Sequence, residues 1–187
     1  MIAKYIIKNL KELKDSIGAT EKNFLITVSK TAKKILLEDI VVDAQENVVG
    51  KVLKARSGSL ARAIYGKVTV KDKSVILELG ADLKKAPYAR IHEYGGVIVP
   101  KKAKALTIPL NGTMGFAREH SGLFIWKSPK SGKLFLAKSD GGNLKLMYLL
   151  AKKVTMPERP YLRPAMEKNK NKLINAIKGL KEKDFKS

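Results

Sequence analysis

Two pairs of residues in this 187-residue chain could do acid–base or metal chemistry, His92-Glu93 and Glu119-His120. Imidazole and carboxylate groups together can bind zinc or move a proton. A helical zinc site, however, needs two histidines four residues apart with the glutamate between them, and here Gly95-Gly96 follows almost at once. We therefore expect ordinary hydrogen-bonded or interface histidines, with no metal ion and no catalytic residue. A metal-dependent hydrolase built on these four side chains is kept as a hypothesis to test.

Other catalytic patterns are weaker still. Ser57-Gly58-Ser59 lacks the Gly-x-Ser-x-Gly arrangement of a nucleophile elbow. Ser131-Gly132-Lys133 has no glycine five residues before Gly132, so it does not complete a phosphate-binding loop. The chain has no cysteine, which excludes disulfides, thiolate zinc sites and cysteine nucleophiles. The sequence predicts neither an enzyme nor a cofactor.

The charge balance indicates an acidic neighbour. The formal net charge is +21, and lysine supplies most of the positive charge because the chain has only six arginines. Lysine acts as a solvated point charge, whereas arginine makes the planar contacts that read bases. A lysine-biased genome explains part of the excess, and the remainder favours a diffuse positive field that attracts nucleic acid without reading it.

The basic residues are densest between residues 99 and 138, where Glu119 is the only acidic residue. Aromatic residues lie among them, so a platform for stacking bases is one interpretation. The interpretation that we favour is that the aromatic residues fill a core while the lysines occupy turns and outward faces. The aromatic residues are Phe116, Phe124, Trp126 and Phe135, and the candidate DNA-facing patch is Lys101, Lys102, Lys104, Lys127, Lys130, Lys133 and Lys138.

Apolar spacing predicts helices at both ends of the chain. Residues 2–15 carry Ile and Leu at spacings of three and four, which predicts a short helix. A long helix should run from an N-cap at Thr20 to about Val49, with Gly50 as a left-handed C-cap. A last helix should follow Pro164, with a frayed tail at residues 182–187.

The centre of the chain predicts antiparallel strands. Alternating apolar residues over 67–79 predict a hairpin with one buried face. Further strand-like runs, separated by Gly and Ser-Pro turns, follow at 97–100, 105–110, 123–127, 134–138 and 144–156. The fold class predicted is α+β. It consists of one domain, 1–187, whose antiparallel meander has N-terminal helices, a C-terminal helix packed on the sheet and a strand-rich insertion at about 97–156.

The N-terminal stretch has lysines threaded through its apolar residues, unlike the continuous apolar core of a signal peptide. No window is long and apolar enough to span a bilayer. We expect a product made in the cytoplasm, with no membrane partner.

Three stretches in order resemble the minor tail-component, or tail-completion and neck, proteins of long-tailed bacteriophages. Residues 57–64 are similar to a Thr/Ser-Gly-x-Leu-x-x-Ser-Ile turn, with Ala63 in place of the family's second serine. Residues 88–96, YARIHEYGG, resemble a Tyr-Ala-x-x-x-Glu-aromatic-Gly-Gly/Thr signature, and residues 157–165 resemble a closing Pro-x-Arg-Pro-aromatic-Leu-x-Pro-Ala motif. The matching positions are Gly58, Leu60, Ile64, His92, Glu93, Tyr94, Gly95, Gly96, Pro160, Tyr161, Leu162, Arg163 and Pro164.

The resemblance implies a virion structural protein at the head–tail junction, with no enzymatic activity. It implies a homo-oligomeric ring, expected to be a hexamer, that meets head connector or tail tube proteins and lets DNA pass through non-specific contacts. His92, Glu93 and Tyr94 would then shape a corner or a subunit contact, and Tyr161 and Leu162 would anchor the last helix. Terminator, stopper and adaptor positions all remain open. The alternative is a DNA-binding protein without sequence specificity.

Overall fold

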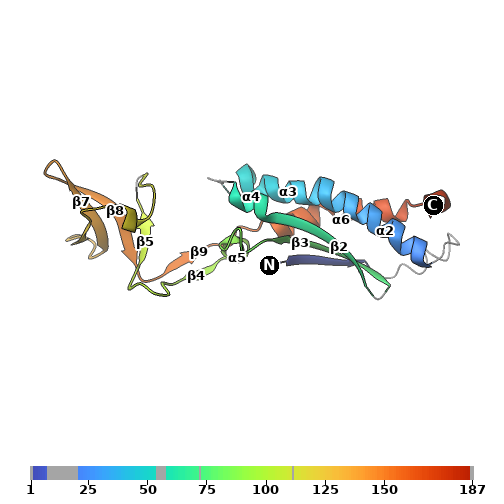
Figure 1. Ribbon diagram of the computed structural model, residues 1–187, viewed down its shortest axis with the longest axis horizontal. Coiled ribbons are helices and arrows are strands. Elements are labelled where there is room, and N and C mark those ends of the chain that lie inside the picture. The colour runs from blue at the N-terminus through green and yellow to red at the C-terminus, as the bar shows by residue number, and fades with distance from the viewer. Residues whose placement is uncertain (1, 8–20, 54–57, 72, 111, 186–187) are drawn as a thin grey trace. The chain divides into compact units, whose positions relative to one another are not determined.

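The computed structural model describes residues 2–7, 21–53, 58–71, 73–110 and 112–185 (Figure 1). The chain forms two compact units, the first made of residues 1–95 and 157–187 and the second of Gly96–Met156. The fold class is α+β, as the sequence predicts. The expected insertion at about 97–156 corresponds to the second unit, which is separately compact and not a set of strands added to one common sheet.

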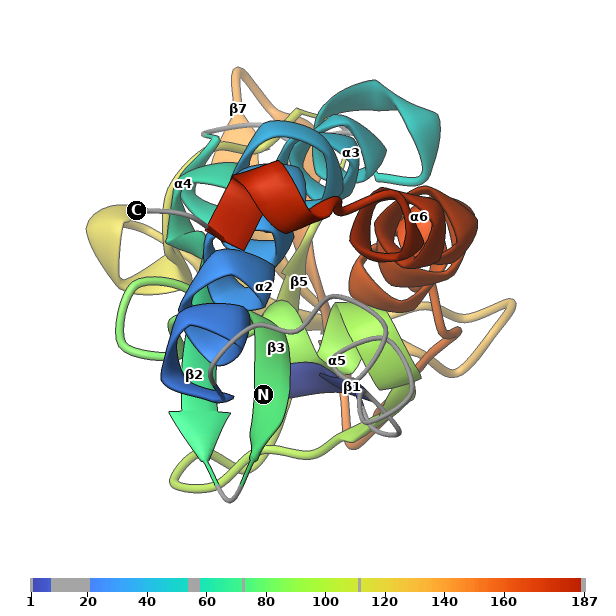
Figure 2. The same cartoon turned by 90° about the vertical axis from the view of Figure 1, so that its right-hand side faces the viewer.

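The first unit is built on a three-stranded antiparallel sheet in the order β1-β3-β2. Its strands are β1 (Ile2–Ile7), β2 (Ile64–Lys71) and β3 (Ser74–Ala81). The hairpin β2–β3 confirms the strands expected at 67–79, and Val75, Leu77 and Leu79 are fully buried on its inner face. Figure 2 shows the helices gathered on one side of these strands.

A continuous helical rod covers the inner face of the sheet. It comprises α2 (Glu21–Ile35), a π-helical turn η1 (Leu36–Ile40), α3 (Val41–Glu46) and a second π-helical turn η2 (Asn47–Lys51). The rod contributes buried residues every four positions: Phe24, Val28, Ala32, Leu36, Ile40, Ala44 and Val48. A spacing of four would wind around a helix of about 3.6 residues per turn. The wider π turns compensate for this drift and keep the stripe facing the sheet.

The rod and β2 approach closely at Gly66. A Cβ atom built on Gly66 would lie 2.8 Å from Cγ of the buried Leu36 and 3.0 Å from Cγ2 of Val41. We expect Gly66→Ala to lower the free energy of unfolding by about 1–3 kcal/mol, because the helix must move off the strand. Urea unfolding followed by far-UV circular dichroism measures this loss.

Gly50→Ala is the matched control for that substitution. Gly50 lies in η2 with no atom within 4 Å of an added Cβ, and alanine favours helix over glycine. We expect Gly50→Ala to leave stability unchanged or to raise it by up to about 1 kcal/mol. Equal losses for the two variants would contradict the close packing of Leu36 on Gly66.

The C-terminal helix α6 (Leu162–Lys178) packs beside the rod and over β1 and β3. Leu173 and Ile177 join the core, and Leu180 after the helix packs against it, partly buried. Two ion pairs tie α6 to the rod, Lys172 Nζ to Asp39 at 2.7 Å and Lys168 Nζ to Asp43 at 2.6 Å. Asn169, which is buried, donates to the second carboxylate oxygen of Asp43 at 2.6 Å.

These contacts make stability depend on the charge of Asp43. Desolvation alone would raise the pKa of Asp43, but the hydrogen bonds from Lys168 and Asn169 outweigh it and hold the pKa below its ordinary value. A carboxyl with a lowered pKa in the folded state adds stability above its unfolded pKa and loses it as the pH falls through the folded pKa. We expect Asp43→Asn to unfold at lower urea than the natural chain at pH 7, with the difference shrinking below about pH 4. A pH-independent difference would contradict this assignment.

The C-terminal tail is ordered up to residue 185, so the expected fraying of residues 182–187 is wrong over the described part. Residues Glu182–Phe185 form a 3₁₀ turn, η4. Phe185 is buried, and its ring stacks on Phe24 with centroids 5.5 Å apart. The hydrophobic area of one aromatic ring is enough to hold a short turn against the rod. Residues 186 and 187 lie outside the described part.

In its described residues, the second unit consists of strands and one short 3₁₀ turn, η3 (Ala117–Glu119). It has a two-stranded ribbon, β4 (Gly96–Ile98) with β9 (Val154–Met156), and a four-stranded antiparallel sheet in the order β5-β8-β7-β6. The strands of that sheet are β5 (Leu106–Pro109), β6 (Phe124–Lys127), β7 (Leu134–Asp140) and β8 (Asn143–Ala151). Each lies within a predicted strand run or overlaps most of one. Pro109 ends an edge strand, where the missing N–H costs least.

Two expectations for the N-terminal part are wrong. Residues 2–7 form the edge strand β1, paired from Ile2↔Gly80 to Ile7↔Val75, and not a helix. The apolar β3 offers this short segment a partner edge, and such tertiary pairing outweighs weak helical spacing. Gly50 lies inside η2 without a left-handed conformation, and the helical rod ends at Lys51. The expected helix at 8–15 and the N-cap at Thr20 lie outside the described residues.

Candidate assembly and nucleic-acid surfaces

The YARIHEYGG stretch forms the short helix α5 (Ala89–Tyr94), and its Glu93 caps α6. Glu93 is fully buried. Its Oε2 accepts hydrogen bonds from the backbone N–H groups of Tyr161 at 2.7 Å and Leu162 at 2.9 Å, and its Oε1 accepts one from the Arg163 N–H at 3.1 Å. The first N–H groups of a helix have no partner within the helix and favour negative charge. A carboxylate from a distant motif therefore supplies the N-terminal cap of α6.

Arg163 neutralises the same carboxylate. Its Nε donates to Glu93 Oε1 at 3.1 Å and its Nη2 donates to the Glu93 carbonyl at 2.9 Å and to Glu158 at 3.2 Å. The hydrogen bonds to Glu158 and Glu93 raise the pKa of Arg163. The guanidinium also lies 5.2 Å from the centre of the Tyr94 ring, within range of a cation–π contact. We call Glu93, Arg163 and the backbone of residues 161–163 the clasp.

Two buried side chains of the closing motif anchor the clasp. Tyr161 has no exposed surface and Leu162 is 1% exposed. The Tyr161 hydroxyl donates to the carbonyl of Ala89 at 3.3 Å, and Asn47 of η2 donates to the carbonyl of Tyr161 at 3.1 Å. Burial is the largest cause of the raised pKa of Tyr161, and the charge of the nearby Glu93 is the second. The phenol therefore stays neutral. Pro164 occupies the first turn of α6, where its missing N–H is tolerated.

The clasp lies where the chain leaves the first unit and where it returns. Gly95 and Gly96, with φ of 63° and 134°, turn the chain away from α5 in conformations that favour glycine. On the return, the N–H of Arg159 donates to the His92 carbonyl at 2.7 Å. The outgoing and returning segments are thus held together within the first unit.

The four candidate catalytic side chains make separate contacts and do not form one site. Glu93 belongs to the clasp. The pKa of His92 is lowered, mainly by burial and to a smaller extent by the charge of Arg159, and its ring packs edge-on against Tyr88. In the second unit Glu119 accepts from the Phe116 N–H at 3.0 Å, and His120 Nε2 donates to the Met114 carbonyl at 2.8 Å. Across the described residues, no group of three His, Cys, Asp or Glu side chains could hold a metal ion.

The Gly58 motif contributes to packing in the first unit. Gly58, with φ of 66°, precedes the five-residue helix α4 (Ser59–Ala63). Leu60 and Ile64 are buried at 5% and 7% exposure and belong to the core under the rod. These two side chains fix the entry into β2.

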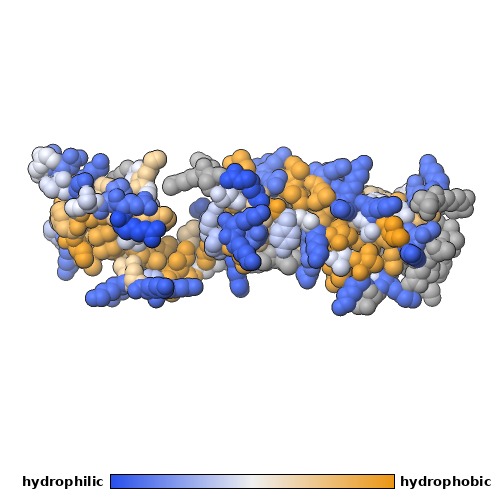
Figure 3. Space-filling model, viewed as in Figure 1, coloured by the Kyte–Doolittle hydropathy of each residue, from blue (hydrophilic) through white to orange (hydrophobic). Residues whose placement is uncertain are grey.

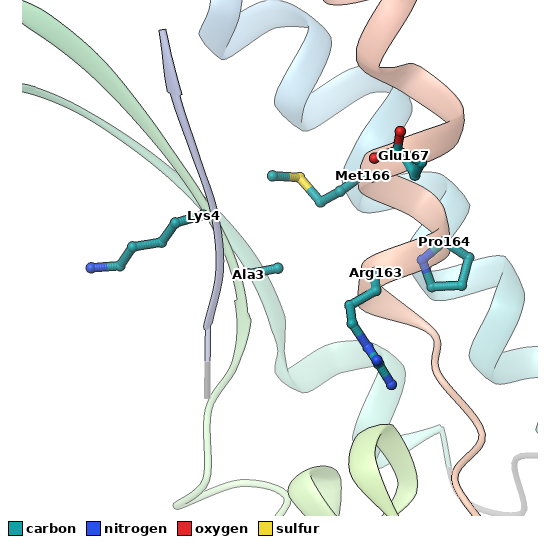
Figure 4. A pocket seen from close by; sticks show the side chains of 6 residues that line it. All are labelled: Ala3, Lys4, Arg163, Pro164, Met166 and Glu167. Atoms are coloured by element: carbon teal, nitrogen blue, oxygen red, sulfur yellow. The ribbon is translucent and has the colours of Figure 1, made fainter. Parts of the chain in front are cut away.

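A pocket of about 470 Å³ lies between β1 and α6 (Figure 4). Ala3 and Met166 form its apolar walls, and Figure 4 shows the Lys4 side chain directed away from α6. Lys4 pairs instead with Glu78 at 2.9 Å. Of the other charged lining residues, Arg163 belongs to the clasp and Glu167 pairs with Lys170 at 3.2 Å, so the pocket presents no paired nucleophile and base.

In the second unit the register gathers basic residues at one end of the four-stranded sheet. The pairs Leu106↔Ala151, Leu134↔Leu150 and Lys127↔Leu134 mark that end. The turn and the two connections that leave it are rich in lysine and contain no acidic residue. We call this set the lysine end: Lys101, Lys102, Lys104, Lys127, Lys130, Lys133, Lys152 and Lys153.

The lysine end contains six of the seven residues of the patch expected from the sequence. Lys138 is separate, because it pairs with Lys145 toward the opposite end of β7 and β8. Lys152 and Lys153 were missed, since nothing in the sequence places the β8–β9 connection beside the β4–β5 connection. Of the ion pairs between described residues, none involves a lysine of the second unit.

The aromatic residues of the second unit do not fill a closed core, which corrects the interpretation favoured from the sequence. The pairs Phe124↔Ala137 and Trp126↔Phe135 place three aromatic side chains on one face of the sheet. Phe124 is 44% exposed, whereas Trp126 and Phe135 are partly buried. The ring centroids of Trp126 and Phe135 are 5.9 Å apart. Phe116, in a separate loop, is 65% exposed beside Arg118. We call Phe124, Trp126 and Phe135 the aromatic face.

A single small sheet cannot enclose these rings. The described hydrophobic side chains of the second unit that are buried are Ala137, Met147 and Tyr148, and none belongs to the core cluster of the first unit. The hydroxyl of Tyr148 donates to the carbonyl of Gly115 at 3.1 Å, so the 112–120 loop covers the face opposite to the aromatic face. Figure 3 shows hydrophobic and hydrophilic surface alternating over this unit.

Comparison with known proteins adds no family to this description. No helix within the described ranges has the length and apolar character to cross a membrane. No protein-family model, curated protein or solved structure matches the chain.

Proposed function

We propose that this protein is a structural component of a bacteriophage head–tail junction, a tail-completion or neck protein that forms a homo-oligomeric ring. In this role it joins the tail to the head and lets DNA pass. It is made in the host cytoplasm and becomes part of the virion. Its partners are copies of itself, the head connector or tail tube proteins, and the passing DNA.

The clasp is the observation that carries the proposal. The second and third family-like motifs are far apart in sequence, yet Glu93 of one caps and neutralises the start of the other. Contact between the motifs supports their interpretation as one structural device and not as chance similarities. The device closes the base of a strand-rich excursion, as the resemblance implies for the longer members of the family.

The lysine end supports contact with passing DNA. Eight lysines without an acidic residue among them attract phosphates by charge alone, and such contacts let a duplex slide.

Light scattering across salt and protein concentration, with and without a short duplex, tests the proposal. We expect a closed oligomer of one mass, with a hexamer as the expected copy number, that forms without DNA. Heterologous contacts that close into a ring fix the number of copies, so the mass should not grow continuously with concentration. Continuous growth to filaments would contradict a closed ring.

A DNA-binding protein without sequence specificity is the second candidate, and the lysine end favours it. This candidate predicts a monomer that binds duplex DNA with sub-micromolar affinity at moderate salt. The logarithm of its binding constant should fall by about 0.9 for each neutralised phosphate as the logarithm of salt concentration rises. That result in the same experiment would replace the ring proposal.

A further inference from the structure

The second unit combines exposed aromatic rings with the lysine end. The 128–133 turn that joins β6 to β7 carries Lys130 and Lys133, and the same two strands carry all three rings of the aromatic face. The turn is held by two backbone hydrogen bonds, from Ser128 to the Lys133 carbonyl and from Gly132 to the Ser128 carbonyl, both 2.9 Å. Positive charges are therefore presented at a fixed place beside the rings.

We propose that the aromatic face and the lysine end together bind single-stranded nucleic acid. Bases stack on Phe124 and on the Trp126–Phe135 pair, while the lysine end holds the phosphates. Stacking on aromatic side chains combined with a positive groove is the general means of binding single strands without reading sequence. This function goes beyond the proposed one, because a passage for duplex DNA requires no unstacked base.

Charge favours a nucleic acid over a second copy of the chain on this face. The second unit has eleven lysine or arginine residues against Glu119 and Asp140. Asp140 pairs with Asn143 at the hairpin tip, at the end of the sheet away from the lysine end. Two copies packed through the aromatic face would bring like charges together, which costs association energy. A phosphate backbone supplies the opposite charge along its whole length.

The geometry also favours a single strand over a duplex. In a duplex the bases are stacked on each other and their faces are hidden, so the aromatic face would contribute nothing. A single strand exposes every base to a ring such as Phe124, whose exposed fraction is 44%. Lysine contacts alone, in contrast, would bind single and double strands alike.

The single tryptophan of the chain makes this proposal measurable. Trp126 is the only tryptophan and lies on the aromatic face, so its fluorescence reports this surface alone. We expect an oligothymidine of about 15 nucleotides, a length suited to such a surface, to quench Trp126 fluorescence on titration into the full chain. A duplex of equal length should bind more weakly and cause less quenching.

Two variants separate stacking from charge. Phe124→Leu keeps apolar bulk but removes the ring, and we expect it to weaken oligothymidine binding about 5- to 100-fold. Ile125→Ala is the matched control, because Ile125 is adjacent on β6, is 67% exposed and faces the opposite side of the sheet. Its affinity should equal that of the natural chain. Circular dichroism establishes that both variants are folded.

Four results would overturn the proposal. Equal loss in the two variants, or oligothymidine binding without quenching, would leave only charge attraction by the lysine end. Equal affinity for duplex and single strand would lead to the same conclusion. A closed oligomer that dissociates in Phe124→Leu and binds no oligothymidine would assign the aromatic face to a contact between copies.

Discussion

Replacing Glu93 with alanine is expected to lower the free energy of unfolding of the first unit by about 2–6 kcal/mol, because the buried backbone donors at the start of α6 lose their acceptor. The carboxylate is fully buried and accepts three backbone N–H groups as well as the Nε of Arg163. Removing it leaves the start of α6 without a cap and leaves a cation without its nearest partner. Buried donors that lose their acceptor keep the full cost of desolvation. Far-UV circular dichroism during urea unfolding follows this loss, because the long helices belong to the first unit.

Two further variants show whether the charge of Glu93 or its shape is responsible. Glu93→Gln keeps the size but presents an NH₂ group to backbone donors, so we expect a loss nearly as large as that of alanine. Glu158→Gln is the matched control, since Glu158 also binds Arg163 but its side chain is 61% exposed. Exposed pairs contribute at most about 1 kcal/mol. Similar losses for Glu93→Gln and Glu158→Gln would show that the clasp is not a buried cap.

The fluorescence of Trp126 separates the clasp from the second unit in the same experiment. Trp126 lies in β6, whereas the hydrogen bonds of Glu93 to described residues are all within the first unit. We expect Glu93→Ala to shift the helical transition to lower urea more than the Trp126 transition. With two compact units, coincident transitions cannot be assumed, so each signal is fitted by itself.

The strands of the second unit could be predicted from sequence because local signals define them. Gly-Gly at 141–142 has φ of 57° and 85°, as the tight β7–β8 hairpin requires, and Gly132 and Pro109 mark other strand ends. The hairpin β2–β3 has equally clear alternation. Such features depend on a few neighbouring residues, and local chemistry is enough to place them.

Features set by distant pairing could not be predicted in this way. Residues 2–7 have apolar spacing compatible with a weak helix, and only the edge of β3, more than 60 residues away, makes them a strand. The role of Glu93 was similarly hidden. The sequence marks it as part of a motif, but its partners at residues 161–163 are separated from it by the whole second unit.

The lysine end and the aromatic face lie between these two cases. The sequence gives the residues of both and even their closeness along the chain. Which side of the sheet each ring occupies follows from the register, in which Trp126 lies opposite Phe135. A shift of one residue would move every ring to the other face. The choice between a core and an exposed platform therefore needed the structure.

Replacing Phe185 with alanine is expected to lower the free energy of unfolding of the first unit by about 2–4 kcal/mol, although the residue is the third from the C-terminus. Phe185 is 5% exposed and its ring lies 5.5 Å from that of Phe24 at an angle of 11°. Truncating a buried phenylalanine typically costs about 3–5 kcal/mol, and a short 3₁₀ turn can relax to recover part of this. The hydroxyl of Thr27 donates to the Asp184 carbonyl at 3.3 Å and gives the turn a second attachment to α2.

Lys183→Ala is the control for this prediction, because Lys183 lies in the same turn with an exposed side chain. Its effect should stay within about 0.5 kcal/mol. A loss confined to Phe185→Ala means that the C-terminal turn closes the end of the core at Phe24. If Phe185→Ala and Lys183→Ala both had negligible effects, residues 182–185 would be a frayed tail, as their lysine-rich sequence predicts. The comparison thus measures how far one aromatic ring extends a core into a segment with no other strong apolar signal.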